Sequence, residues 1–84
     1  MKVEYYLDIL KPHQPGVDLL ARSLMKIDGV TRVHIKVDEL DQKTASLHMN
    51  IEGTNLSLDE VTEVLGSMNC ALHSVDEVNL EEKD

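Results

Sequence analysis

The fold is decided by residues 3–13, which read VEYYLDILKPH. Because side chains alternate along an extended chain, one side of this stretch is apolar and carries Val3, Tyr5, Leu7 and Ile9. The other side is mixed and carries Glu4, Tyr6, Asp8 and Leu10. Pro12 ends the pattern, because proline has no N–H to donate to a sheet. We therefore expect a central strand of a sheet, with a carboxylate near the middle of its mixed face.

Size and charge narrow the class of protein. The 84 residues make one domain with a modest core, which contains neither Phe nor Trp and must be filled by aliphatic side chains. Such a small core favours self-association, which covers more apolar surface. The net charge is −8, from 16 acidic and 8 basic residues, and it argues against binding to nucleic acid or to an anionic membrane. It suits either a plain acidic surface or a site for cationic ligands or divalent metal ions.

The single cysteine, Cys70, permits no disulfide within the chain and is typical of a reducing compartment. We expect it to be a small buried residue. The sequence does not open with a basic and then apolar leader, and it contains no apolar run approaching about 18 residues. These features predict a soluble protein of the cytoplasm.

The rest of the chain alternates helical and extended patterns. Apolar residues recur at helical spacing in residues 17–28 and 58–68, and they alternate with polar residues in 30–37 and 45–52. A last strand is expected over residues 70–78, where polar residues blur the alternation as a bulge does. Residues 80–84 are expected to form a frayed acidic tail.

Turn residues mark the boundaries of these elements. Gly29 and Asn69 each follow a helical pattern and suit the left-handed backbone that ends many helices. Ser57 and Glu60 form the pattern of a capping box at the start of the second helix.

The predicted order is strand–helix–strand–strand–helix–strand. Each strand–helix–strand half crosses over in the right-handed sense. Two such halves make an α+β fold, the ferredoxin-like sandwich, with a four-stranded antiparallel sheet in the order 4-1-3-2 and both helices on one face.

This topology gathers polar residues in two places. One end of the sheet collects His13, Asp38, Glu39, Asp41 and His73. Its carboxylates can serve a hard cation such as calcium, or they can form a solvated turn. On the helix-free face, Asp8, His48 and His34 can lie in a row, which suits a transition metal or a face covered by a subunit. Tyr6 and Leu10 on the same face favour coverage by another copy of the chain, and the two outer strands offer unpaired edges for such contacts.

No catalytic grouping is evident in the sequence. We therefore expect a non-enzymatic, self-associating module that binds a small ligand or a metal ion. One alternative is an enzyme with a site between subunits, in which His73 or His13 acts as the acid–base group near Asp8 or Asp76. Another alternative is a regulatory subunit that docks a second protein by an edge strand.

Four segments carry a family resemblance: LDILKPH at residues 7–13, GV at 29–30, ELD at 39–41 with Thr44, and HSVDEV at 73–78. On these segments the chain resembles an archaeal family of small uncharacterised proteins, domain of unknown function 211. Asn69 stands where this family often has glycine.

The resemblance implies a ferredoxin-like fold, ring-shaped homo-oligomers and a divalent metal ion, with calcium favoured. It attaches no reaction to the chain. The polar residues at matching positions form the candidate metal site: Asp8, Glu39, Asp41, His73, Asp76 and Glu77.

Overall fold

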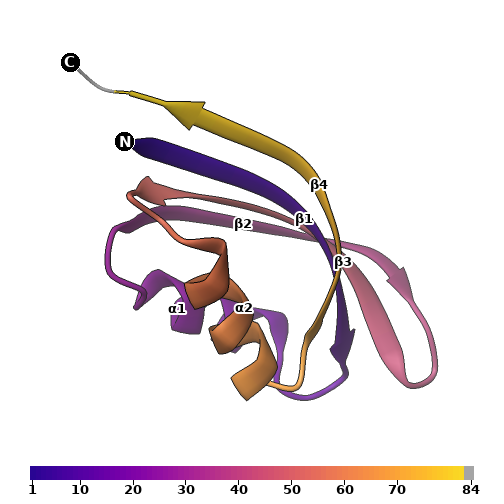
Figure 1. Ribbon diagram of the computed structural model, residues 1–84. Coiled ribbons are helices and arrows are strands. Elements are labelled where there is room, and N and C mark those ends of the chain that lie inside the picture. Colours follow the sequence, from indigo (N-terminus) through magenta and orange to yellow (C-terminus); the bar gives the residue numbers. More distant parts are fainter. Residues whose placement is uncertain (83–84) are drawn as a thin grey trace.

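A computed structural model describes residues 1–82 of the chain. Its elements, in order, are β1 (Lys2–Pro12), α1 (Val17–Met25), β2 (Val30–Leu40), β3 (Thr44–Thr54), α2 (Leu58–Ser67) and β4 (Ala71–Glu81). The four strands form one antiparallel sheet in the order β2-β3-β1-β4 (Figure 1). Read from the other edge, this is the predicted order, so the ferredoxin-like fold is confirmed.

Both helices lie on one face of the sheet (Figure 1). Beneath them, Ile9 is fully buried, with 0% of its surface exposed. On the opposite face, Tyr6 is 38% and Leu10 is 40% exposed. The alternation of β1 therefore selects the buried face as predicted, and we refer to the helix-free side as the open face.

The turns follow the residue types that the sequence places there. Gly29 has φ 91° and Asn69 has φ 62°, so both adopt the predicted left-handed backbone. Ser57 is the N-cap of α2, but its side chain makes no capping hydrogen bond, so this part of the predicted capping box is wrong. The first helical bond comes instead from the Val61 N–H to the Ser57 carbonyl oxygen, at 3.3 Å.

The strands are longer than the sequence pattern indicated. β2 continues to Leu40, and the hairpin closes with the Asp41 N–H donating to the Thr44 carbonyl oxygen at 2.8 Å. β4 continues to Glu81, which pairs with Lys2. The frayed tail expected from Leu80 therefore does not begin there, because β1 supplies ladder partners for Leu80 and Glu81. The last two residues of that expected tail, Lys83 and Asp84, lie outside the described residues.

β4 carries two bulges, which confirms the irregularity expected in this strand. Leu72 and Ser74 oppose the adjacent residues Ile9 and Asp8, so His73 is an extra residue. By the same pairing pattern, Asp76 is an extra residue between Val75 and Glu77.

The helices cover only the middle of the sheet. An 11-residue strand spans about 36 Å, whereas helices of 9 and 10 residues span about 15 Å. Two diagonally opposite corners of the helix-covered face therefore keep exposed apolar residues. Leu40 at the end of β2 is 68% exposed, and Leu80 at the far end of β4 is 61% exposed. Within residues 1–82, neither helix is long and apolar enough to cross a membrane.

Candidate functional site

The open face is built from rows of side chains that run across all four strands. One row contains Lys36, His48, Asp8 and Ser74, and the next contains His34, Asn50, Tyr6 and Glu77. The predicted row of Asp8, His48 and His34 is therefore wrong in one member. Asp8 does oppose His48, but the third position belongs to Lys36, because alternation fixes the face of a side chain and leaves the register free to shift by two residues.

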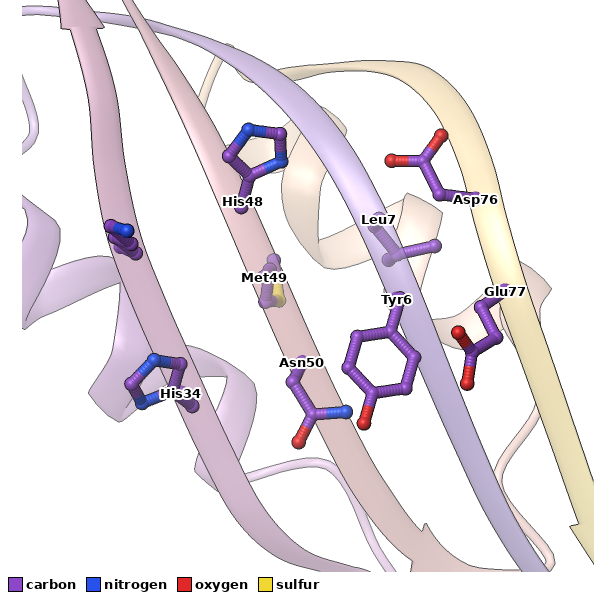
Figure 2. A pocket seen from close by; sticks show the side chains of 9 residues that line it. Tyr6, Leu7, His34, His48, Met49, Asn50, Asp76 and Glu77 are labelled. Atoms are coloured by element: carbon purple, nitrogen blue, oxygen red, sulfur yellow. The ribbon is translucent and has the colours of Figure 1, made fainter.

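A shallow depression of about 390 Å³ lies across this face. Figure 2 shows its two sides, with His34 and His48 on one side and Asp76 and Glu77 on the other. Lys36 lies on the same side as the two histidines, since it follows His34 on β2 and opposes His48. Tyr6 and Asn50 lie between the two sides (Figure 2).

A hydrogen-bond network joins Asn50 and Tyr6, which line the depression, to the next row of side chains on the open face. Asn50 is buried and donates from Nδ2 to Glu4 Oε2 at 3.0 Å, while its Oδ1 accepts a bond from Arg32 Nη1. Asn79 Nδ2 donates to Glu4 Oε1 at 3.1 Å, and the Tyr6 hydroxyl donates to Glu4 Oε2 at 3.3 Å. These contacts fix the Glu4 carboxylate and the ring of Tyr6 in place.

The network shifts two pKa values. The pKa of Glu4 is lowered from its usual 4.5, first because Asn50 donates to the charged carboxylate and further through Glu52, Asn79 and Tyr6. The pKa of Tyr6 is raised from 10.0, mainly because the negative charge of Glu4 disfavours a second negative charge beside it. The face therefore holds a fixed anion at Glu4 next to a neutral phenol at neutral pH.

The bulge at His73 brings an imidazole to a carboxylate. His73 Nδ1 lies 3.5 Å from Asp8 Oδ2, and the Asp8 side chain is 24% exposed. At the second bulge, the Ser74 hydroxyl donates to Asp76 Oδ1 at 2.7 Å. The sequence indicated an irregular strand here, but the contact between His73 and Asp8 depends on the position of the extra residue.

The six candidate metal ligands fall into two groups within one chain. Asp8, His73, Asp76 and Glu77 lie on β1 and β4, whereas Glu39 and Asp41 lie at the hairpin end of β2. Glu39 and Asp8 are on strands separated by two spacings, roughly 10 Å. Within residues 1–82, no three His, Cys, Asp or Glu side chains come together as a metal site.

The end of the sheet that holds the hairpin does join some of the predicted residues. His13 Nε2 lies 2.8 Å from the Asp41 carbonyl oxygen, and His48 Nε2 lies 3.3 Å from Asp38 Oδ2. These contacts tie the loop after β1 to the β2–β3 turn and tie β3 to β2. The contact of His13 is with a backbone oxygen, so the Asp41 carboxylate itself has no part in it.

Lys11 is a structural residue that the sequence did not reveal. It is 3% exposed, and its ammonium group donates to the carbonyl oxygens of Pro12 at 2.7 Å, His13 at 3.3 Å and Pro15 at 2.7 Å. It stands on the buried side of β1, in phase with Ile9, and that position was the available signal.

Cys70 is buried, as predicted, and its thiol lies 3.6 Å from the Met68 carbonyl oxygen. Burial raises the pKa of this thiol above 9.0, although Lys11 opposes the shift. The thiolate is the nucleophilic form, so the structure gives Cys70 the character of an inert core residue.

Comparison with known proteins identifies the family of the chain. Residues 4–83 match the model of domain of unknown function 211 (DUF211), described as "Uncharacterized ArCR". The chain is also similar to the uncharacterised protein MJ0319 of Methanocaldococcus jannaschii, with 42% identity over 72 residues. That alignment covers 86% of this chain and 74% of the relative. The chain therefore belongs to the archaeal family of domain of unknown function 211.

Proposed function

We propose that the protein is a non-enzymatic, homo-oligomeric module that binds a small ligand or a divalent metal ion. The observation that carries this proposal is the depression on the open face, to which all four strands contribute side chains. A depression of about 390 Å³ is within the range of small-molecule sites.

Self-association is supported by the two uncovered corners of the sheet. Leu40 and Leu80 are exposed at opposite ends of the two edge strands, β2 and β4. Within residues 1–82, the outer sides of these two edge strands have no strand paired with them. Unpaired strand edges can join one chain to another, so we expect β2 of one copy to pair with β4 of the next.

Such a contact joins two different surfaces and therefore repeats from copy to copy, which produces a closed ring when the rotation closes. In an antiparallel pairing that keeps the open faces on one side, the hairpin end of β2 meets the end of β4 that carries His73. Glu39 and Asp41 of one copy then approach His73 on β4 of its neighbour, which in turn lies 3.5 Å from Asp8. This arrangement would add Glu39 and Asp41 to the pair formed by His73 and Asp8, as candidate ligands for a calcium ion between subunits.

The assembly is tested by light scattering and sedimentation at tens of micromolar. Leu40→Asp and Leu80→Asp should each yield monomers, while Leu19→Asp, at an exposed site on α1, should remain oligomeric. A mixture of the two monomeric variants should form dimers and stop there, because each retains one intact edge. A monomeric wild-type protein would contradict the proposed assembly.

The metal is tested by calorimetry after treatment with a chelator. Calcium should bind the wild-type protein, and both Asp41→Ala and Asp8→Asn should weaken binding, while Asp59→Ala on α2 should not. If an oligomeric protein gives no heat of binding with calcium, the metal ion is excluded from the proposal. The binding of a small ligand would then remain as the proposed function.

One observation favours a second candidate function. His73 Nδ1 and Asp8 Oδ2 are 3.5 Å apart, as in an acid–base pair in which the carboxylate orients the imidazole. An enzyme of this kind should lose its activity in His73→Gln and keep it in His34→Gln. A substrate screen in which no activity depends on His73 would count against this candidate.

A further inference from the structure

The depression on the open face is divided by charge. His34 lines it from β2, at one edge of the sheet, and Asp76 and Glu77 line it from β4, at the other edge (Figure 2). Lys36 also lines it from β2. The two strands are separated by three interstrand spacings, about 14 Å. A ligand that touches both sides therefore meets a cationic group at one end and carboxylates at the other.

The groups on the β2 side are free to bind. Among residues 1–82, Lys36 and His34 form neither a side-chain hydrogen bond nor an ion pair, whereas His48 on β3 is engaged by Asp38 at 3.3 Å. An ammonium group and an imidazole N–H are both donors that suit the oxygens of a carboxylate.

The groups on the β4 side are held in position but keep unused acceptor capacity. Glu77 Oε2 accepts one hydrogen bond from Asn79 at 2.9 Å, and Asp76 Oδ1 accepts one from Ser74 at 2.7 Å. A carboxylate has about four acceptor sites, and a primary ammonium has three donors. The pair is therefore suited to an amine that lies between them.

Between the charged sides lies Tyr6 (Figure 2), and its hydroxyl donates to Glu4 Oε2 at 3.3 Å. Tyr6 is 38% exposed, and its ring offers an apolar surface in the middle of the depression. That surface is complementary to a chain of methylene groups joining two polar ends.

From this arrangement we infer that the depression binds an elongated zwitterion, with its amine on Asp76 and Glu77 and its carboxylate on Lys36 and His34. The separation of the two sides favours a molecule in which several methylene groups lie between amine and carboxylate. The inference rests on the proposed function, because the ligand can bind only if the open face stays uncovered in the oligomer. Contacts between strand edges leave this face uncovered.

The test compares three linear probes of similar length by calorimetry or by amide chemical shifts. ε-Aminocaproate has one amine and one carboxylate, hexamethylenediamine has two amines, and adipate has two carboxylates. The wild-type protein should bind ε-aminocaproate more tightly than either of the others. Lys36→Gln and Glu77→Gln should each weaken this binding roughly three- to fivefold, as expected for exposed charge pairs.

Matched controls use charged residues outside the depression. Lys43→Gln in the hairpin turn and Glu63→Gln on α2 remove the same charges and should leave binding of ε-aminocaproate unchanged. Lys36→Glu should reverse the preference and favour hexamethylenediamine, a result that loss of folding cannot produce.

Two results would overturn the inference. One is that the wild-type protein binds ε-aminocaproate and hexamethylenediamine equally well and that Lys36→Gln changes neither affinity. In that case the site would recognise only the amine, and Lys36 would have no part in binding. The other is no binding of ε-aminocaproate at millimolar concentration by a protein that still assembles and binds calcium. In both cases the proposed function stands, and only the identity assigned to the ligand fails.

Discussion

Gly29 and Gly53 lie backbone against backbone where β2 enters the sheet. The Gly29 carbonyl oxygen lies 2.5 Å from the place that a Cβ atom on Gly53 would occupy. The same oxygen accepts a hydrogen bond from the Thr54 N–H at 2.8 Å, so it cannot move away without losing that bond. Gly29 also has a φ of 91°, a backbone conformation that residues other than glycine rarely adopt. The connection between α1 and β2 thus depends on two glycines that touch.

We expect Gly53→Ala to lower the free energy of unfolding by about 1–3 kcal/mol, because the new methyl group must displace backbone atoms. Gly66→Ala is the matched control, since a Cβ atom there meets nothing within 4 Å. It should raise stability by about 0.5–1 kcal/mol by replacing glycine in a helix. Urea denaturation of the two variants measures both changes in the free energy of unfolding. Equal changes would contradict the close contact between Gly29 and Gly53.

Lys11→Met should destabilise the protein by roughly 1–3 kcal/mol, because it removes the donor that satisfies three carbonyl oxygens in the loop after β1. Methionine has a similar volume, so the loss of stability would come from removing the ammonium group and not from a cavity. Lys26→Met, at an exposed position after α1, should change stability by less than about 0.5 kcal/mol. Thermal or urea unfolding distinguishes the two, and comparable small effects would show that water replaces Lys11.

The lowered pKa of Glu4 predicts a pH dependence that Asn50 controls. A carboxyl group with a lower pKa when folded contributes stability above its unfolded value of 4.5, and this contribution is lost as pH falls through the folded value. Asn50→Ala should raise the pKa of Glu4 toward 4.5, and Asn79→Ala should raise it less, because Asn50 is the larger cause.

Carbon-detected NMR titration of the Glu4 carboxyl group between about pH 2 and 7 measures these shifts. The stability gap between the wild-type protein and Asn50→Ala should also narrow as pH falls below 4.5. A gap that is constant with pH would mean that Asn50 stabilises the sheet only through its bonds to Arg32 and the Tyr5 carbonyl oxygen.

The raised pKa of Cys70 predicts slow alkylation of the folded protein. Burial disfavours the thiolate, so the rate with iodoacetamide should have its midpoint above pH 9.0 and should rise steeply on unfolding in urea. Mass spectrometry of quenched samples follows the reaction. Labelling of the folded protein at neutral pH, at the rate of a free thiol, would show that the site opens readily.

The sequence was sufficient to predict the fold because alternation in β1 separates an apolar side from a mixed one. Ile9 lies in the core and Leu10 lies on the open face, as the pattern requires. The left-handed turns at Gly29 and Asn69 were also predictable, because few other residues adopt that backbone at low cost.

The last strand resisted prediction for a physical reason. Its helix-side residues are Leu72, Val75, Val78 and Leu80, because each bulge inserts one residue and delays the next inward position. Spacings of three are not the signature of a strand, so its inward positions could not be assigned. The contact between His73 and Asp8 arises from one of these insertions and was hidden for the same reason.

The set of side chains that line the depression depends on the registers in which the strands pair, and the alternation of residues does not determine these registers. Alternation places His34, His48 and Asp8 on one face, but the structure shows that Lys36 takes the place expected for His34. Lys11 was missed because a lysine is seldom fully buried, and its acceptors are loop carbonyl groups that carry no mark in the sequence.

Because the helices are shorter than the strands, the protection of the sheet from solvent differs along its length. Where α1 and α2 lie on β1 and β3, opening a backbone hydrogen bond requires disruption of the core, so these amides should exchange with deuterium only through global unfolding. Neither α1 nor α2 reaches the hairpin end of β2 or the far end of β4, so water has access to the strands there. Those amides should exchange through small local openings, and a partner that clamps either end would slow them while leaving the centre unchanged.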